Sequence, residues 1–227
     1  MPIDLYRSLG SGPCTVVQLV AAALDLELNL IDINVYGGDH LKPEYLKMNP
    51  QHTIPTIMDD GFSIWESRTI ARYLANKYGK DSTLYPADVK LRALVDQRLD
   101  FDLGTLYTRF SQFFYPQFTT GAPADPALQK KFEESLGVLD AFLEGNTYAV
   151  GDHLTIADLS LVATVSSLEF FDINLKEYPN VLRWFDLVKS TAPKYEEITS
   201  KALEVLRRAA AQLKEKQKSC STAAEPR

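Results

Sequence analysis

The hydrophobic pattern changes near residue 80, and this change constrains the fold most. Before it, short apolar runs of period two alternate with segments of helical spacing. The expected elements are a strand at 3–5, a helix from Pro13, a strand at 28–35, a helical turn at 43–48, a hairpin at 57–64 and a helix at 67–79. The hairpin turns at Asp60-Gly61, and Ser67 is expected to cap the helix that stops at Gly79. A crossover helix makes the first two strands parallel, so the order predicts a small mixed sheet of thioredoxin type.

After a polar, proline-containing linker at 81–87, all of the apolar spacing is helical. The expected helices span 88–118, 126–144, 155–170, 180–190 and 194–213. Thr155 and Asp158 have the spacing of a capping box, which gives Asp158 a structural role. We therefore expect an α/β N-terminal thioredoxin-like domain at 1–80 and an all-α C-terminal helical domain at 88–213. Residues 214–227 are polar and are expected to form a disordered tail.

The composition limits the classes of partner. Apolar residues make up 45% of the 227, as in ordinary globular proteins, and the net charge of −6 argues against nucleic acid or an anionic membrane as a partner. No apolar run reaches the roughly 18 residues of a membrane span, and no secretory signal is visible. The two cysteines, Cys14 and Cys220, do not suggest a structural disulfide, so a cytoplasmic location is expected. No histidine has metal-ligand spacing, so no metal is expected.

The tetrapeptide Ser11-Gly12-Pro13-Cys14 lies between the first strand and the first helix. Thiol–disulfide oxidoreductases have two cysteines at this junction, where the helix N-terminus stabilises a thiolate. Serine cannot form a disulfide, but its hydroxyl can donate a hydrogen bond to a thiolate of another molecule. Lowering a thiol pKa from about 8.5 to about 7 requires about 2 kcal/mol. One hydrogen bond to a charged acceptor supplies about 1.5–3 kcal/mol, so Ser11 alone is sufficient.

Two alternatives remain for this motif. Ser11 could serve only as a helix N-cap, a role that would compete for the same hydroxyl. Cys14 could itself be reactive, which would make the protein a thiol transferase that forms mixed disulfides. Because Val16 and Val17 follow it on an apolar helix, Cys14 is interpreted as a small buried hydrophobic residue.

Four motifs in this order resemble the cytosolic glutathione transferase family. They are the segments at 10–14, 49–56, 65–68 and 155–158. The aromatic runs at 106–110 and 115–118 further resemble the insect delta class, although Leu9 and Thr15 depart from its usual residues beside the site. The resemblance implies glutathione as co-substrate and a homodimer. Other classes of the family use a tyrosine near the end of the first strand, but Tyr6 is interpreted as a packing residue.

The resemblance also implies roles for individual residues. Ser11 would stabilise the glutathione thiolate, and a cis peptide at Ile54-Pro55 would let the backbone of Ile54 pair with the cysteinyl part. Glu66 would bind the γ-glutamyl ammonium, and Arg68 its carboxylate, although such a pair is more commonly a solvated surface pair. The expected glutathione-binding residues are His40, His52, Thr53, Ile54, Pro55, Glu66, Ser67 and Arg68, with the two histidines near the glycyl carboxylate.

An aromatic cluster on the first long helix would form the site for the second substrate. The delta-class resemblance implies that hydrophobic electrophiles contact Tyr107, Phe110, Tyr115 and Phe118, while Phe113 and Phe114 belong to the core. A flat aromatic wall discriminates weakly between similar substrates. The expected function is detoxification by conjugation of glutathione, including dehydrohalogenation. The alternatives are a non-catalytic ligand-binding or assembly module of the same fold, and a thiol transferase that acts through Cys14.

Overall fold

The computed structural model describes residues 2–80, 83–171 and 173–222, so two residues of the expected linker, 81 and 82, lie outside the described residues. Its sheet has the order β2-β1-β3-β4. The strands are β1 (Ile3–Arg7), β2 (Leu28–Asp32), β3 (Thr56–Asp59) and β4 (Phe62–Trp65). β1 pairs in parallel with β2, and β3 runs antiparallel to both β1 and β4. The expected mixed sheet is confirmed, although β2 ends three residues earlier than its apolar pattern.

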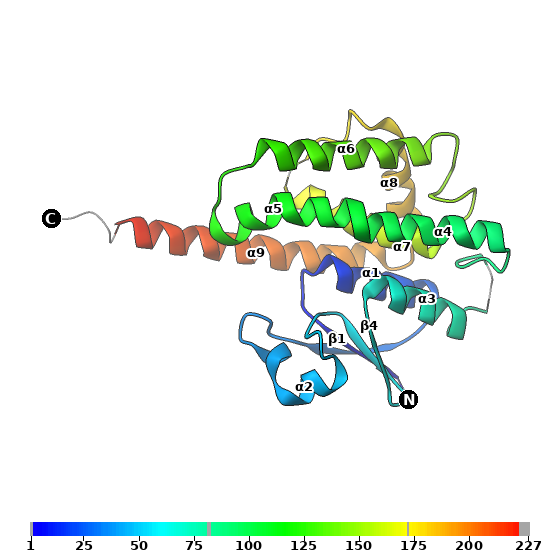
Figure 1. The fold of residues 1–227 in the computed structure, drawn as a ribbon, viewed down its shortest axis with the longest axis horizontal. Helices are drawn as coiled ribbons and strands as arrows, with labels where there is room; N and C mark the ends of the chain where they lie inside the picture. The colour runs from blue at the N-terminus through cyan, green and yellow to red at the C-terminus, as the bar shows by residue number, and fades with distance from the viewer. Residues whose placement is uncertain (1, 81–82, 172, 223–227) are drawn as a thin grey trace.

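Helices cover the sheet on both sides. α1 (Gly12–Ala23) and α3 (Ser67–Tyr78) lie between the sheet and the rest of the molecule, while α2 (Pro43–Met48) lies on the opposite side, after the short helix η1 (Asp39–Leu41) (Figure 1). α1 is apolar along most of its length because it is enclosed: Val16, Val17, Leu19 and Val20 are fully buried. This arrangement presents the start of α1 to the second domain.

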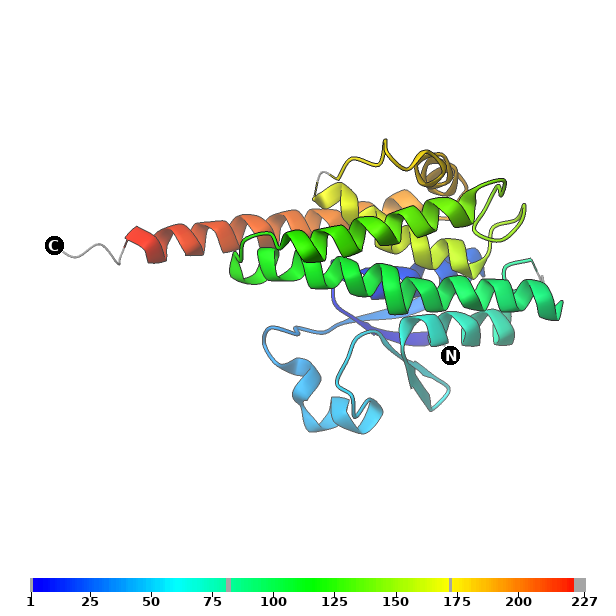
Figure 2. The same ribbon diagram turned by 45° about the horizontal axis from the view of Figure 1, so that its top comes forward.

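The second domain is entirely helical in its described residues. Its elements are α4 (Val89–Phe101), η2 (Asp102–Tyr107), α5 (Thr108–Thr120), α6 (Pro126–Leu143), α7 (Ile156–Phe170), α8 (Pro179–Thr191) and α9 (Tyr195–Thr222). Where one helix over 88–118 was expected, α4 and α5 are joined by the π-helical segment η2, so the three form one long rod (Figure 2). α9 continues to Thr222, past its expected end, so residues 214–222 of the expected disordered tail are helical and 223–227 lie outside the described residues.

α7 is the central helix of this domain. It is buried on nearly all sides and packs against α1, α4, α8 and α9. Its predicted capping box is present, with the Asp158 side chain accepting from the backbone N–H of Thr155 at 2.9 Å. The same carboxylate accepts from the backbone N–H of Ala149 at 2.7 Å and from Nε1 of Trp184 at 2.8 Å. Asp158 therefore also joins α8 and the loop before α7 to the core.

Candidate active site

Ser11 is the N-cap of α1, held by a loop of fixed shape. Its Oγ accepts a hydrogen bond from the backbone N–H of Cys14 at 3.4 Å. The preceding Gly10 has a φ of +81°, and a Cβ atom there would lie 3.1 Å from Cγ of Leu206 on α9. The backbone conformation favours glycine here, and any side chain would also press against Leu206 of α9.

The cap and the proposed thiolate contact do not compete. A hydroxyl has two lone pairs and one proton, and the cap uses only a lone pair. The Ser11 proton stays available for an acceptor at the positive end of α1. The cap also restricts the rotation of the hydroxyl, which prepares it to donate.

Cys14 is in a different environment. It is 1% exposed, and burial raises the pKa of its thiol to about 11. A thiol with this pKa is protonated at neutral pH and a poor nucleophile. The structure therefore supports the interpretation of Cys14 as a packing residue.

The Ile54-Pro55 peptide bond is cis, as the sequence resemblance implied. The loop before this bond is held by hydrogen bonds from Tyr45 of α2 and from Asn49, the C-cap of α2. The Tyr45 hydroxyl donates to the carbonyl of Thr53 at 2.6 Å, and Nδ2 of Asn49 donates to the same carbonyl at 2.9 Å. Ile54 reaches the wall of the cavity that Ser11 lines.

The segment at 66–68 is arranged differently from the expectation. Glu66, not Ser67, is the N-cap of α3, with a φ of +69°, and Ser67 is the first helical residue. Arg68 is buried, and its guanidinium binds Asp102 through Nε at 3.1 Å and Nη2 at 2.6 Å. Its Nη1 donates to Oγ of Ser67 at 2.9 Å. Arg68 therefore points into the protein, and Ser67 is the group it orients.

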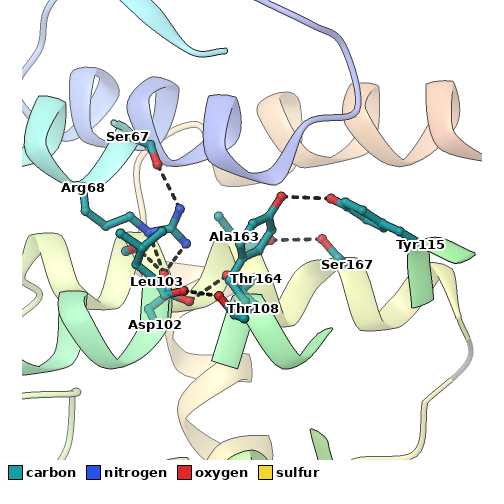
Figure 3. Close-up of polar contacts among 11 residues, drawn as sticks. Ser67, Arg68, Asp102, Leu103, Thr108, Tyr115, Ala163, Thr164 and Ser167 are labelled. Atoms are coloured by element: carbon teal, nitrogen blue, oxygen red, sulfur yellow. Dashed lines mark hydrogen bonds and ion pairs between the residues drawn. The ribbon is translucent and has the colours of Figure 1, made fainter. Parts of the chain in front are cut away.

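Asp102, the first residue of η2, is the centre of this network (Figure 3). It is 0% exposed and also accepts hydrogen bonds from the hydroxyls of Ser160 at 2.5 Å and Thr164 at 2.8 Å, both on α7. Since Ser67 accepts from Arg68, this contact leaves the proton of its own hydroxyl unused. The network thus connects α3, η2 and α7 behind the expected γ-glutamyl site.

The two histidines expected near the glycyl carboxylate lie together. The ring centroids of His40 and His52 are 6.0 Å apart. Nδ1 of His40 is buried without a hydrogen-bond partner in the part of the chain that the structure describes. The pair lies on the same side of the sheet as α2 and could receive an anionic group of a ligand.

An apolar cavity of about 240 Å³ opens beside Ser11. Three of the four aromatic residues expected there contribute to its wall, namely Phe110, Tyr115 and Phe118. Tyr107 does not line it; its hydroxyl lies 2.9 Å from that of Tyr115. A second cavity of about 340 Å³, more polar, lies on the other side of the Ser8–Ser11 loop, between α1, β2 and α9. The apolar cavity is the better candidate for an electrophile because its wall is aromatic.

Comparison with known proteins agrees with this geometry. Residues 5–82 match the model of the glutathione S-transferase N-terminal domain, and residues 105–191 match that of the C-terminal domain. A delta-class glutathione transferase of Nilaparvata lugens is 44% identical over 93% of this chain and 100% of its own, with a TM-score of 0.90. The chain belongs to the glutathione transferase family. Glutathione transferase BmGSTD1 of Bombyx mori is 43% identical over 92% of this chain and 98% of its own, with a TM-score of 0.90. An epsilon-class glutathione S-transferase of Musca domestica is 38% identical over 94% of this chain and 98% of its own, with a TM-score of 0.85.

Sequence reasoning about this transferase missed several residues that the structure brings to the site. Asp102 is one of several carboxylates in this charged helical stretch, and nothing in the spacing singled it out or indicated Arg68 as its partner. The cavity wall also contains residues that were not expected, among them Val35, Tyr36, Phe170 and Phe171. Phe170 is the last residue of α7 and Phe171 is its C-cap.

Two further features of this transferase concern the described residues only. None of the helices described is long and apolar enough to cross a membrane. Within the same residues, no group of three or more His, Cys, Asp or Glu side chains is placed to hold a metal ion.

Proposed function

We propose that this transferase binds reduced glutathione against Ser11, favours its thiolate and adds it to hydrophobic electrophiles. The observation that carries the proposal is the position of the Ser11 hydroxyl. It caps α1 through a lone pair, retains its proton, and lies in the wall of an apolar, aromatic cavity. A thiolate there would receive one hydrogen bond and the favourable end of the helix dipole.

The polar groups around the cavity support binding of a zwitterionic tripeptide. Glu66 at the start of α3 is half-buried and would face the γ-glutamyl ammonium, while the Ser67 hydroxyl and the first N–H groups of α3 would face its carboxylate. His40 and His52 would receive the glycyl carboxylate, with Thr53, Ile54 and Pro55 beside the cysteinyl part. Arg68 acts in this scheme through Ser67, because its guanidinium is bound to Asp102.

The decisive experiment titrates the thiolate absorbance of glutathione bound to the wild type and to Ser11→Ala. Loss of one hydrogen bond to the thiolate costs about 1.5–3 kcal/mol, so the pKa of the bound thiol should rise by about 1–2 units. Ser190→Ala is a matched control, because this hydroxyl on α8 donates only to the carbonyl of Leu187. An unchanged thiol pKa in Ser11→Ala would contradict the proposal.

Dehydrohalogenation would use the same thiolate as a base on a haloalkane. The thiolate would remove a proton, halide would leave, and the glutathione thiol would then return its proton to solvent. Incubation with a haloalkane should therefore yield an alkene without net consumption of glutathione. Consumption of one glutathione per halide released would instead show substitution alone.

We also propose a cytoplasmic homodimer, as is typical of the family. Two exposed leucines on one face of α4, Leu91 and Leu94, support a dimer interface there. The alternative of a non-catalytic module of the same fold predicts retention on glutathione resin without turnover of any electrophile. Turnover of a benzylic chloride would exclude it.

A further inference from the structure

Two residues of the expected glutathione site have an unusual backbone conformation. His52 has a φ of +49° and Glu66 a φ of +69°, values that few residues other than glycine adopt. His52 lies in the loop after α2, whereas Glu66 lies between β4 and α3. A residue in such a conformation persists only where the surrounding structure holds it. The contacts around these two residues therefore determine the shape of the site.

A hydrogen bond joins the residues that precede them. Nε1 of Trp65 donates to Oε1 of Gln51 at 2.9 Å. Gln51 comes directly before His52 and Trp65 directly before Glu66, so this one contact lies next to both unusual residues. It connects the loop after α2 to the end of β4. Movement of either segment against the other would stretch or break it.

A second hydrogen bond holds the start of the same loop. Oγ of Ser63 donates to the carbonyl of Met48, the last residue of α2, at 2.8 Å. Ser63 and Trp65 alternate along β4, so their side chains lie on the same face of the sheet. β4 thus holds this part of the loop at its start, through Met48, and just before His52, through Gln51.

Within the loop, Asn49 fixes the backbone of the residues that follow. Its Oδ1 accepts from the backbone N–H of Gln51 at 2.9 Å, and its carbonyl accepts from the backbone N–H of His52 at 3.0 Å. These two bonds are local, so they fix the shape of the loop. The Trp65 contact has a different effect, because it fixes the loop against the strand that leads to Glu66.

The contact spans the two ends of the ligand in the proposed function, on which this inference rests. There His52 receives the glycyl carboxylate and Glu66 the γ-glutamyl ammonium. These groups are at opposite ends of one tripeptide, so their partners must be held at a fixed separation. A ligand that reaches both ends benefits from a separation set in advance, because ordering the site during binding would lower its affinity. A ligand that reaches only one end gains nothing from it.

We propose that Trp65 and Gln51 are positioning residues that set the distance between the glycyl and γ-glutamyl ends of the glutathione site. Neither side chain has to touch the ligand for this role. Their hydrogen bond makes the site selective for the complete tripeptide. It favours glutathione over γ-glutamylcysteine and cysteinylglycine, two dipeptides that contain the same thiol and lack one end each.

The experiment measures dissociation constants by calorimetry, directly for glutathione and by displacement of glutathione for the two dipeptides. Gln51→Met removes the acceptor and keeps a side chain of similar length. Its dissociation constant for glutathione should rise about fivefold, within the range of one net hydrogen bond. The constants for both dipeptides should stay within about twofold of the wild type, because each dipeptide reaches a single end. The KM for glutathione should rise with kcat unchanged, since Ser11 is not moved.

Trp65→Phe tests the other half of the contact. It removes the donor, keeps an aromatic ring and should give the same pattern. The double variant of Trp65 and Gln51 should bind glutathione no more weakly than either single variant, because each one alone already breaks the shared bond. Additive losses would instead indicate two independent effects on packing and would overturn the proposal.

Gln129→Met is the matched control. Nε2 of this exposed glutamine also donates to a side chain, Oε1 of Glu133, at 2.8 Å, but both residues lie on α6. This variant should bind glutathione and the two dipeptides as the wild type does.

The outcomes separate this inference from the proposed function. An equal loss for glutathione and for one dipeptide would overturn the inference, because the contact would then shape only that end of the site. An unchanged dissociation constant for glutathione in Gln51→Met and Trp65→Phe would overturn it as well. If the wild type binds glutathione but conjugates nothing, the proposed catalysis fails while the binding data still decide the inference. A wild type that binds none of the three thiols would contradict both.

Discussion

Ser11 and Cys14 are one helical turn apart but have opposite environments. Ser11 lies in the wall of an open cavity and has a proton to donate. Cys14 faces the core, and its thiol has a pKa of about 11 because of burial. In the proposed function, the start of α1 would stabilise a thiolate only on the side where Ser11 lies, and that thiol would come from another molecule.

Cys14 should be unreactive in the folded protein. In a Cys220→Ser variant, where Cys14 is the remaining cysteine of the sequence, we expect no reaction with an aromatic disulfide reagent until guanidinium chloride is added. Cys14→Ala should retain conjugation activity. Rapid labelling of the native variant with loss of activity would instead support the thiol transferase alternative.

At the scale of elements, η2 positions the buried carboxylate of Asp102. This π-helical segment interrupts the rod of α4 and α5, and π-helical turns often occur at functional sites. Hydrophobic spacing predicted a continuous helix over this stretch but not its π-helical segment. One π-helical turn changes the spacing of apolar residues too little to be noticed in the sequence. The burial of Arg68 was also unpredictable, since its partner is 34 positions away and on another domain.

Asp102→Asn should destabilise the protein strongly. Removing the charge leaves the buried Arg68 guanidinium unpaired, which costs about 3–5 kcal/mol of unfolding free energy in urea denaturation. The KM for glutathione should rise as well, because Ser67 loses its orienting contact.

The matched control for this prediction is Asp100→Asn. Asp100 also pairs with an arginine of α3, Arg72, but it is 71% exposed, and such a pair contributes about 0–1 kcal/mol. Equal losses in Asp100→Asn and Asp102→Asn would mean that burial of the Asp102 pair has no special importance.

The turn between β3 and β4 is joined to α3 through Asp59, which gives a pH dependence. Burial alone would raise the pKa of Asp59, but hydrogen bonds from Lys77, Tyr73 and Tyr78 outweigh it and hold this pKa below its ordinary value. A lowered folded-state pKa stabilises the fold above the unfolded value of about 3.9, and this contribution is lost as the pH falls through the folded value.

We therefore expect the wild type to lose more stability than Asp59→Asn as the pH falls from about 5 to below the unfolded value of about 3.9 in urea denaturation. At neutral pH the variant should be less stable by about 1–3 kcal/mol, because donors that face Asp59 would be left unsatisfied. Parallel pH profiles for the two proteins would contradict this assignment.

At the scale of the whole molecule, the two domains supply different halves of the site. The first contributes Ser11 and the residues expected to bind glutathione, and the second contributes the aromatic wall. This division was predictable because the change from mixed to helical patterning is strong and the family motifs fall in order. The length of α9 was not, because polar residues alone do not distinguish a solvated helix from a disordered tail.

The proposed homodimer can be tested on α4. Leu94 is exposed there beside Leu91, and Leu94→Glu should place charge in the interface and give a monomer by light scattering. Leu182→Glu is the control, since Leu182 is similarly exposed on α8. A wild type that is already monomeric, or two variants that behave alike, would exclude α4 as the interface.

The contact between Gly10 and Leu206 has a consequence for biosynthesis. Leu206 lies in the last helix, so the loop that carries Ser11 gains its support from α9 only after nearly the whole chain has left the ribosome. A nascent first domain can form its sheet but lacks this wall of the cavity. Chains released early should therefore not capture cellular thiols, and activity should begin only when translation is almost complete.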